Sequence, residues 1–156
     1  GKIDCIPNRE NHMWFQADEI GTWYGQCAEF CGTQHAKMLI RVISEDKKDF
    51  DSWATNQLLP AVEVPTPMNG KDTFLSLACV NCHTVQGVTH QGGFGPDLTH
   101  LMSRDTIASG AAENTPENLT KWLLNPNSIK DGCLMPNMML TENQVASLVE
   151  FLTTLK

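Results

Sequence analysis

The chain has 156 residues, of which 41% are hydrophobic and 19% charged, as in an ordinary globular protein. Its formal net charge of −7 and pI near 5.1 argue against nucleic acid as a partner, since nucleic-acid binding needs basic patches. No segment approaches the roughly 20 apolar residues of a membrane helix, and no signal peptide opens the chain. Because the first residues look like folded sequence, we expect a fragment of a longer protein.

The first part of the chain, residues 1–58, is predicted to be a β-type domain. Short runs rich in aromatic and β-branched residues predict strands at 13–15, 21–24 and 38–43, separated by polar turns. Residues 49–58 place apolar side chains at helical spacing, which predicts a short amphipathic helix.

A proline-rich segment, residues 59–69, follows and is predicted to be an extended, semi-rigid linker. The remaining residues, 70–156, are predicted to form a small all-α domain. Its first helix is expected at 71–82, and a glycine-rich loop follows at 91–96.

Two further helices are marked by their first residues. Thr115 as N-cap and Pro116 at the first helical position predict a helix that must end before Pro126. Thr141 and Gln144 match a capping box, and apolar residues at helical spacing follow them. The sequence therefore predicts a β domain, a linker and a helical domain.

Six cysteines occur, and two pairs of them belong to metal-binding motifs, which leaves Cys5 and Cys133. These two could form a disulfide in an oxidising compartment, although sequence spacing cannot establish the pairing. We favour buried free thiols, because an unpaired cysteine usually behaves as a small hydrophobic residue.

The helical domain contains the pattern Cys-x-x-Cys-His at Cys79, Cys82 and His83, which is typical of haem c attached by two thioether bonds. The histidine of such a pattern is an axial iron ligand. A zinc site would need a second ligand pair, and a thioredoxin-type redox site would need a βαβ context. The pattern therefore favours haem c.

The sixth iron ligand is expected to be a methionine, because a His/Met pair raises the reduction potential and suits electron transfer. Met135 is the preferred candidate, since it lies between two predicted helices and Pro136 stiffens its loop. Met138 and Met139 are close rivals, and Met102 is a weaker one. The remaining histidines of this domain, His90 and His100, are predicted not to bind iron.

Residues 70–156 resemble a class I cytochrome c in this attachment pattern, in Gly95 and Pro96, and in Met135 followed by proline. The resemblance implies that the Pro96 carbonyl accepts a hydrogen bond from the axial histidine and so orients it. It also implies that Phe74 and Phe151 pack where the first and last helices cross. Arg104 and Trp122 are candidates for binding the haem propionates, or else a solvated charge and a core aromatic.

The β domain carries a second metal-binding pattern. Cys27 and Cys31, four residues apart, can bridge two copper ions through their thiolates, and His35 and Met38 follow on the same loop. Soft sulfur ligands select copper. Zinc is the rival, because two cysteines and a histidine also suit it.

This loop resembles the binuclear CuA loop of cytochrome c oxidase subunit II, and the segment 2–9 resembles that family's Lys-x-Asp-x-x-Pro-Gly-Arg stretch, with asparagine in place of its glycine. The resemblance implies the C-terminal part of a cupredoxin-like β-barrel. Cys27 and Cys31 would bridge both coppers, with His35 and the Glu29 carbonyl completing one and Met38 the other. The resemblance also implies a contact between Glu29 and magnesium. The family's second copper histidine would precede Gly1, so the copper site is expected to be incomplete.

A copper loop followed by a cytochrome c domain resembles subunit II of the caa-type haem–copper oxidases. The resemblance implies an electron-entry subunit without catalytic residues of its own, which passes electrons via haem c and CuA to subunit I, where oxygen is reduced. The implied partners are subunit I, other oxidase subunits and an electron donor. The donor would be a cytochrome c-like protein, a small copper or iron–sulfur protein, or a quinol-oxidising complex. The implied location is the periplasm or the outer face of the bacterial cytoplasmic membrane, with membrane helices before Gly1.

Two alternatives remain open at the level of sequence. The first is a stand-alone cytochrome c electron carrier with a non-functional copper loop. The second is the electron-entry module of a nitric oxide reductase. A copper chaperone or zinc-binding structural module is disfavoured, because a covalent haem serves neither role.

Overall fold

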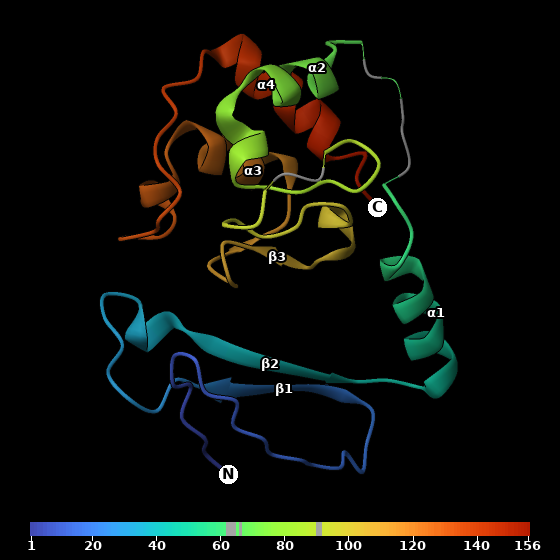
Figure 1. Cartoon of the computed structure of the whole chain (residues 1–156), viewed down its shortest axis with the longest axis vertical. Helices are drawn as coiled ribbons and strands as arrows, with labels where there is room; N and C mark the ends of the chain where they lie inside the picture. Colours follow the sequence, from blue (N-terminus) through green and yellow to red (C-terminus); the bar gives the residue numbers. More distant parts are fainter. Residues whose placement is uncertain (62–64, 66, 90–91) are drawn as a thin grey trace.

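The computed structural model describes residues 1–61, 65, 67–89 and 92–156. The chain begins in a long loop and a two-stranded sheet, continues into helix α1 (Lys47–Gln57), and ends in a group of short helices. Figure 1 shows the sheet and the helical group as separate bodies, with α1 leading from the end of the sheet toward the helices.

The sheet consists of strands β1 (Gly21–Gln26) and β2 (Leu39–Ser44), which pair antiparallel along their whole length. They confirm the strands predicted at 21–24 and 38–43 to within two residues. Helix α1 confirms the helix predicted at 49–58, although it begins two residues earlier. The loop between β1 and β2 holds the 3₁₀ helix η1 (His35–Lys37) and carries the predicted copper ligands.

The strand predicted at 13–15 is wrong. These residues have no strand structure, and the side chain of Trp14 is 90% exposed. Aromatic residues favour strands only where they pack on a pleated surface, and a strand needs a neighbour for its backbone hydrogen bonds. No described strand pairs with this segment, so its local propensity has no effect.

The helix predicted at 71–82 is interrupted. Helix α2 (Gly70–Ser76) ends at Leu77, whose backbone is extended, and a 3₁₀ helix, η2 (Ala78–Asn81), follows. The haem-attachment residues therefore lie on a tight turn after α2 rather than on its surface. The sequence offers no glycine or proline near Leu77, so the usual helix-ending signals are missing.

The two other predicted helices are confirmed with their caps. Helix α3 (Pro116–Leu124) begins where the Thr115 side chain accepts a hydrogen bond from the Asn118 N–H, and it ends before Pro126. Helix α4 (Glu142–Leu152) begins with the full capping box of Thr141 and Gln144. Between α3, α4 and the attachment turn the structure also contains two kinds of shorter element: the 3₁₀ helices η3 (Leu101–Ser103) and η4 (Pro126–Ser128), and the strand pair β3 (Thr106–Ile107) and β4 (Ala112–Glu113).

The hydrophobic core belongs to the helical domain, because every buried hydrophobic residue of the described chain lies at or after Ala61. Its centre is the crossing of α2 and α4, where the rings of Phe74 and Phe151 lie 5.6 Å apart, as predicted. In contrast, Trp23 and Ile40 on the β1–β2 sheet are 43% and 58% exposed. A two-stranded sheet with open faces has little stability of its own.

The predicted fold class is confirmed in its coarser part, a β segment followed by a helical domain. Among the described residues the strands form two-stranded sheets, and no closed barrel is present. None of the described helices has the length and apolar character needed to span a bilayer.

The predicted linker, residues 59–69, lies partly outside the described residues, namely at 62–64 and 66. Its first residues contact the helical domain. The Ala61 N–H donates to the Gln86 carbonyl at 3.0 Å, and Nε2 of His100 lies 3.0 Å from the Leu59 carbonyl oxygen. The start of the segment is therefore fixed to the helical domain.

Candidate redox centres

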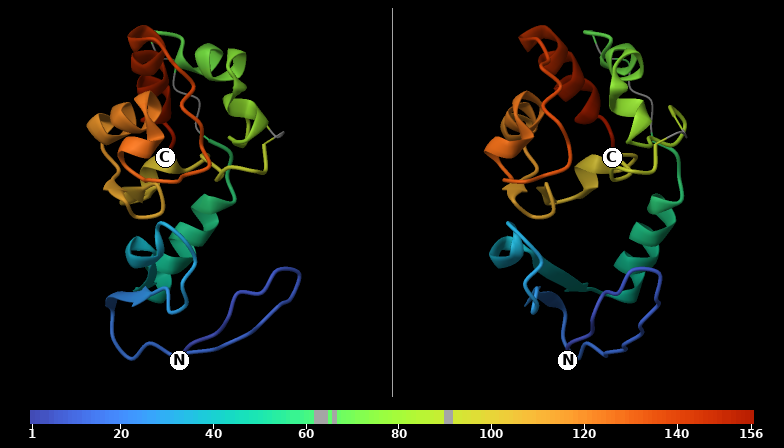
Figure 2. Two further views of the ribbon diagram at one scale, coloured as in Figure 1. Left: turned by 90° about the vertical axis from the view of Figure 1, so that its left-hand side faces the viewer. Right: turned by 60° about the vertical axis from the view of Figure 1, so that its left-hand side comes forward.

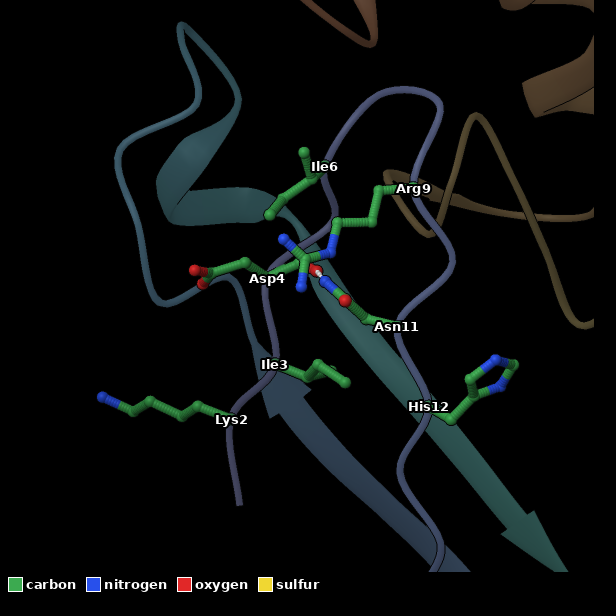
Figure 3. Close-up of a pocket in the computed structure, with 7 residues that line it drawn as sticks. All are labelled: Lys2, Ile3, Asp4, Ile6, Arg9, Asn11 and His12. Carbon is green, nitrogen blue, oxygen red and sulfur yellow. Dashed lines mark hydrogen bonds between the residues drawn. The ribbon is translucent and has the colours of Figure 1, made fainter.

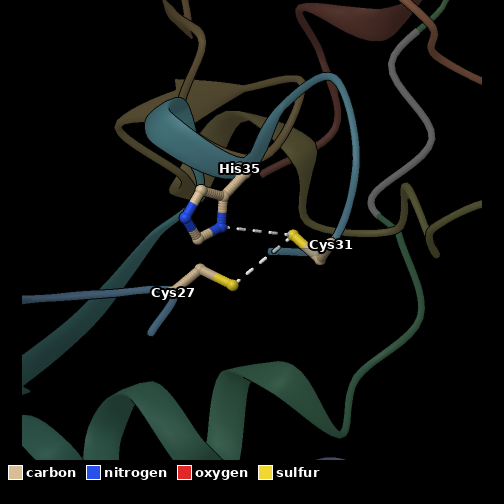
Figure 4. A group of neighbouring side chains, drawn as sticks. All are labelled: Cys27, Cys31 and His35. Carbon is tan, nitrogen blue, oxygen red and sulfur yellow. Dashed lines mark hydrogen bonds between the residues drawn. The ribbon is translucent and has the colours of Figure 1, made fainter. Parts of the chain in front are cut away.

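The loop between β1 and β2 brings soft ligand atoms together (Figure 4). Sγ of Cys27 lies 3.4 Å from Sγ of Cys31, and Sγ of Cys31 lies 3.9 Å from Nδ1 of His35. The sulfur of Met38 lies 3.8 Å from Sγ of Cys31, and the Glu29 carbonyl oxygen lies 3.2 Å from Sγ of Cys27. All five groups named from the sequence for the copper site thus converge.

Backbone hydrogen bonds close this loop. The Cys27 N–H donates to the Met38 carbonyl at 3.1 Å, which extends the β1–β2 ladder by one step. The His35 N–H donates to the Gly32 carbonyl at 3.0 Å, and Gly32 has a φ of 122°, a conformation that disfavours any side chain. The sheet therefore supplies both ends of the loop, and the glycine turn lets His35 fold back onto the thiols.

The Cys27 thiol influences the ionisation of Cys31. The hydrogen bond with Cys27 raises the pKa of Cys31, with further contributions from burial and from the neighbouring Cys27 charge. Two thiolates at this separation repel each other unless a cation lies between them. Two sulfurs, a ring nitrogen, a thioether and a carbonyl form a donor set that suits copper and fits poorly with a hard cation.

Within the described residues, the cluster of cysteine, histidine and acidic side chains arranged for a metal consists of Cys27, Cys31 and His35. His12 does not join it: its side chain is exposed, and its Nε2 lies 3.8 Å from a Glu10 oxygen. Figure 3 shows His12 beside Asn11 on the rim of a shallow pocket formed by the segment 2–12, with its ring pointing away from Lys2.

The haem-attachment residues occupy the turn after α2. The N–H groups of Cys82 and His83 both donate to the Cys79 carbonyl, at 3.2 Å and 2.9 Å. Both cysteines are partly buried free thiols, so both sulfurs are available for thioether bonds. Burial raises the pKa of Cys79, and a smaller effect comes from the Cys82 charge.

The imidazole of His83 is held on two sides. Its Nδ1–H donates to the Pro96 carbonyl at 2.8 Å, the hydrogen bond that the resemblance implies, and this leaves Nε2 free to bind iron. A Cβ at Gly95 would lie 2.6 Å from Cε1 of this ring, so only glycine lets the loop pass this close. The turn, the free thiols and the oriented imidazole fit a covalently bound haem.

The methionine candidates differ in their surroundings. Met135 and Met102 are partly buried and pack against the hydrophobic core, whereas Met139 is 89% exposed. Met138 is partly buried. The structure favours Met135 over Met139, and Met135 as the axial ligand stays a prediction.

The remaining candidates lie at the edge of the helical core or outside it. Arg104 is exposed and donates through a guanidinium nitrogen to the Asp97 carbonyl, while Trp122 packs partly buried against the core. Cys5 and Cys133 are free thiols, as favoured, but Cys5 is exposed and Cys133 only partly buried. The prediction for His90 lies outside the described residues.

Sequence reasoning missed two polar side chains that the structure places at important contacts. His100 is buried, and its two ring nitrogens lie 2.9 Å and 3.0 Å from the carbonyl oxygens of Lys156 and Leu59. Gln34, between two predicted copper ligands, donates to the carbonyl of Asp131 at 2.8 Å. No sequence pattern marks either residue, since both depend on partners 41 to 97 positions away.

The fold and the two clusters define a metalloprotein with two redox segments, a thiol-rich loop and a haem-attachment domain. Residues 1–45 match the family described as the periplasmic domain of cytochrome c oxidase subunit II, and residues 67–156 match the cytochrome c family. The chain therefore belongs to the cytochrome c family in its C-terminal part and joins that domain to a subunit II periplasmic domain. The first domain implies the CuA copper centre and the second implies haem c.

Curated proteins are similar to the whole chain or to part of it. Cytochrome c oxidase subunit 2 of Alkalihalophilus pseudofirmus is 38% identical over 160 residues, which cover 100% of this chain and 46% of that protein. The subunit 2 of Bacillus sp. strain PS3 is 35% identical over 170 residues, with coverages of 100% and 47%. The subunit 2 of Arabidopsis thaliana matches 59 residues at 46% identity, 38% of this chain and 23% of that protein. The chain thus spans about half the length of the relatives that cover it fully.

Proposed function

We propose that this chain is part of the electron-entry subunit of a terminal haem–copper oxidase. It would accept electrons from a donor at haem c, hold CuA as the second centre, and deliver the electrons to subunit I for oxygen reduction. The observation that carries the proposal is the convergence of the Cys27, Cys31, His35 and Met38 donor atoms on the chain that also holds the haem-attachment turn. In this proposal the oxygen chemistry belongs to subunit I.

On the helical side, Cys79 and Cys82 would attach the haem and His83 would bind its iron. When bound, the haem supplies a one-electron redox couple. Pro96 orients the imidazole through its carbonyl, and Met135 is proposed as the opposite ligand. Arg104 and Trp122 are proposed to lie near the propionates.

On the copper side, Cys27 and Cys31 would bridge the metals. His35, Met38 and the Glu29 carbonyl would complete the donor set that this chain offers. We infer that the second copper histidine lies in a part of the protein that corresponds to the half of the relatives not spanned by this chain. The strands that close a cupredoxin-like barrel over the exposed sheet would lie in the same part. Glu29 is also the proposed contact for magnesium.

The partners proposed for the whole protein follow from the same relatives. They are subunit I, the other oxidase subunits and a separate electron donor of unassigned class. The proposed location is the periplasmic or outer face of the bacterial cytoplasmic membrane. A subunit II periplasmic domain supports the outer face, and the anchoring helices would again belong to the longer protein.

The test is to quantify copper and iron in the full-length protein purified from its host, and to record its near-infrared spectrum. We expect two coppers for each haem iron and the charge-transfer band of a mixed-valence copper pair. Exchange of Cys31 for serine should abolish the band and leave the haem spectrum unchanged. Iron without copper in the unaltered protein would support a stand-alone cytochrome c instead. Turnover of the intact complex with nitric oxide rather than oxygen would support a nitric oxide reductase.

A further inference from the structure

We propose that Thr33 and Gln34 dock the copper-ligand loop onto the turn at 130–132, and that this contact positions the two redox centres for electron exchange within one chain. The proposal rests on the proposed function for its electron-transfer role. The contact itself is a separate structural claim.

The two residues lie between copper-ligand candidates, since Cys31 precedes them and His35 follows. Nε2 of Gln34 donates to the main-chain carbonyl of Asp131 at 2.8 Å. The side chain of Thr33 faces Gly132: an ideal Cβ there would lie 3.6 Å from Oγ1 and 3.7 Å from Cβ of Thr33, which is ordinary van der Waals distance. Figure 2 shows the loop that carries η1 approaching the helical group from below.

The opposite side of the contact is also fixed. Two hydrogen bonds hold the backbone of this turn. The Gly132 N–H donates to Oδ1 of Asn127 at 3.0 Å, and the Cys133 N–H donates to the Lys130 carbonyl at 3.2 Å. Gly132 has a φ of 72°, so the turn is a left-handed one that suits glycine. This turn ends three residues before Met135.

A second hydrogen bond joins the same two parts of the chain. Nη1 of Arg41, on β2, donates to Oγ1 of Thr106 on β3 at 3.3 Å. The guanidinium also lies over the ring of Tyr24, 5.5 Å from its centre, which orients it. Two separated contacts restrict rotation as well as translation between the sheet and the helical domain.

The chemical step that this contact serves is simple. With both groups bound, the haem would supply one electron and the copper pair would take it up, and no bond between protein atoms would form or break. A protein accelerates such a step by holding donor and acceptor in one arrangement. Gln34 and Thr33 are therefore positioning residues, because the contacts described above join them to Asp131 and Gly132 and not to a candidate metal ligand.

The contact is tested by a designed disulfide in the full-length protein. The double variant Thr33→Cys with Gly132→Cys places two Cβ atoms at about 3.7 Å, inside the range of about 3.5–4.5 Å that disulfides require. Oxidised glutathione should accept the two electrons and cross-link the pair, as detected by peptide mass spectrometry. The matched control is Thr33→Cys with Gly110→Cys, because Gly110 also has a positive φ, 90°, and open space around it. No cross-link beyond that of the control would overturn the proposal.

The role in electron transfer is tested with Gln34→Ala, which keeps every cysteine native. The exposed Gln16→Ala is the control. We expect haem-to-copper transfer, measured after flash photolysis in the intact complex, to slow roughly two- to tenfold, the effect of losing one hydrogen bond on the docked population. Reduction of the haem by its donor and the metal content should not change, and Gln34→Lys, which retains an N–H donor, should recover part of the rate.

An unchanged transfer rate in Gln34→Ala would overturn the positioning role even if the cross-link forms. Failure of the proposed function looks different: the unaltered protein would then show no haem-to-copper transfer at all, while the disulfide experiment would still report the contact.

Discussion

Replacing Gly95 by alanine is expected to displace the imidazole of His83. An ideal Cβ at Gly95 lies 2.6 Å from Cε1 and 2.8 Å from Nδ1 of that ring. Non-bonded carbon atoms prefer separations of about 3.5–4.0 Å, so the ring or the loop must move by roughly 1 Å. Gly95 does not have a positive φ, so the expected effect is steric and does not come from the backbone conformation.

Neither side of this contact moves freely. The imidazole is fixed by its 2.8 Å hydrogen bond to the Pro96 carbonyl, and the Gly95 N–H donates to the Cys82 carbonyl at 2.7 Å. Overpacking at a constrained site costs typically about 1–3 kcal/mol. We therefore expect Gly95→Ala to lower the free energy of unfolding by that amount and to weaken the bond between His83 and iron.

The assay is guanidinium unfolding of the haem-loaded protein, together with the absorption spectrum that reports iron ligation. The matched control is Gly93→Ala, because a Cβ at Gly93 meets no atom within 4 Å. That variant should be neutral, or more stable by about 0.4–1 kcal/mol through the lower entropy of its unfolded chain. If Gly95→Ala behaved like Gly93→Ala in both measurements, the steric reasoning would be refuted.

Three further predictions concern the helical domain. Gly70→Ala would place a Cβ 2.2 Å from the Ser147 carbonyl oxygen, so it should destabilise the protein by at least about 1–3 kcal/mol in chemical unfolding, whereas helix propensity alone predicts a gain. His100→Leu should cost about 1–3 kcal/mol, because the ring N–H that can donate to one of the two carbonyls is lost in a buried site; a midpoint equal to that of the unaltered protein would count against this. Hydrogen bonds from its own backbone N–H and with Thr115 lower the pKa of Glu117, so its stabilising effect is present above the ordinary glutamate pKa of about 4.3 and disappears as the pH falls through the lowered value. Glu117→Gln should therefore reduce the melting temperature at pH 7 and not at pH 2, and a difference that persists in acid would contradict the assignment.

The helices were predictable where their first turns carry their own signals. Thr115 and Thr141 accept hydrogen bonds from orphan N–H groups, and Pro116 has no N–H that needs a partner, so three or four neighbouring residues decide where α3 and α4 begin. The end of α2 at Leu77 was not predictable, because the residues of the attachment turn continue a helical apolar pattern without a breaker.

The strands show the opposite limit. The predicted strands 21–24 and 38–43 pair with each other across the loop at 27–38. The segment 13–15 has the same aromatic character but pairs with no described strand. Strand formation depends on a second segment, and composition cannot say whether that segment is present. The same reason explains why a barrel implied by resemblance is seen here only as a hairpin.

The site was predictable where its ligands are close in sequence. Cys27, Cys31, His35 and Met38 come from one loop, so their atoms are within reach of one another once the β1–β2 pair closes that loop. The contacts of Gln34 and His100 required the tertiary fold, because their partners are main-chain carbonyls that any residue could supply.

The hydrogen bonds of Leu59 and Ala61 determine where the cytochrome part can be separated from the rest. A fragment beginning at residue 67, where the cytochrome c family match starts, would lose the carbonyl that faces Nε2 of His100 and the N–H that donates to Gln86. A fragment beginning at Leu59 keeps both. Proteolysis is therefore expected to yield a stable fragment only when the cut falls before Leu59. Residues 59–61 thus act as a structural cap of the haem domain.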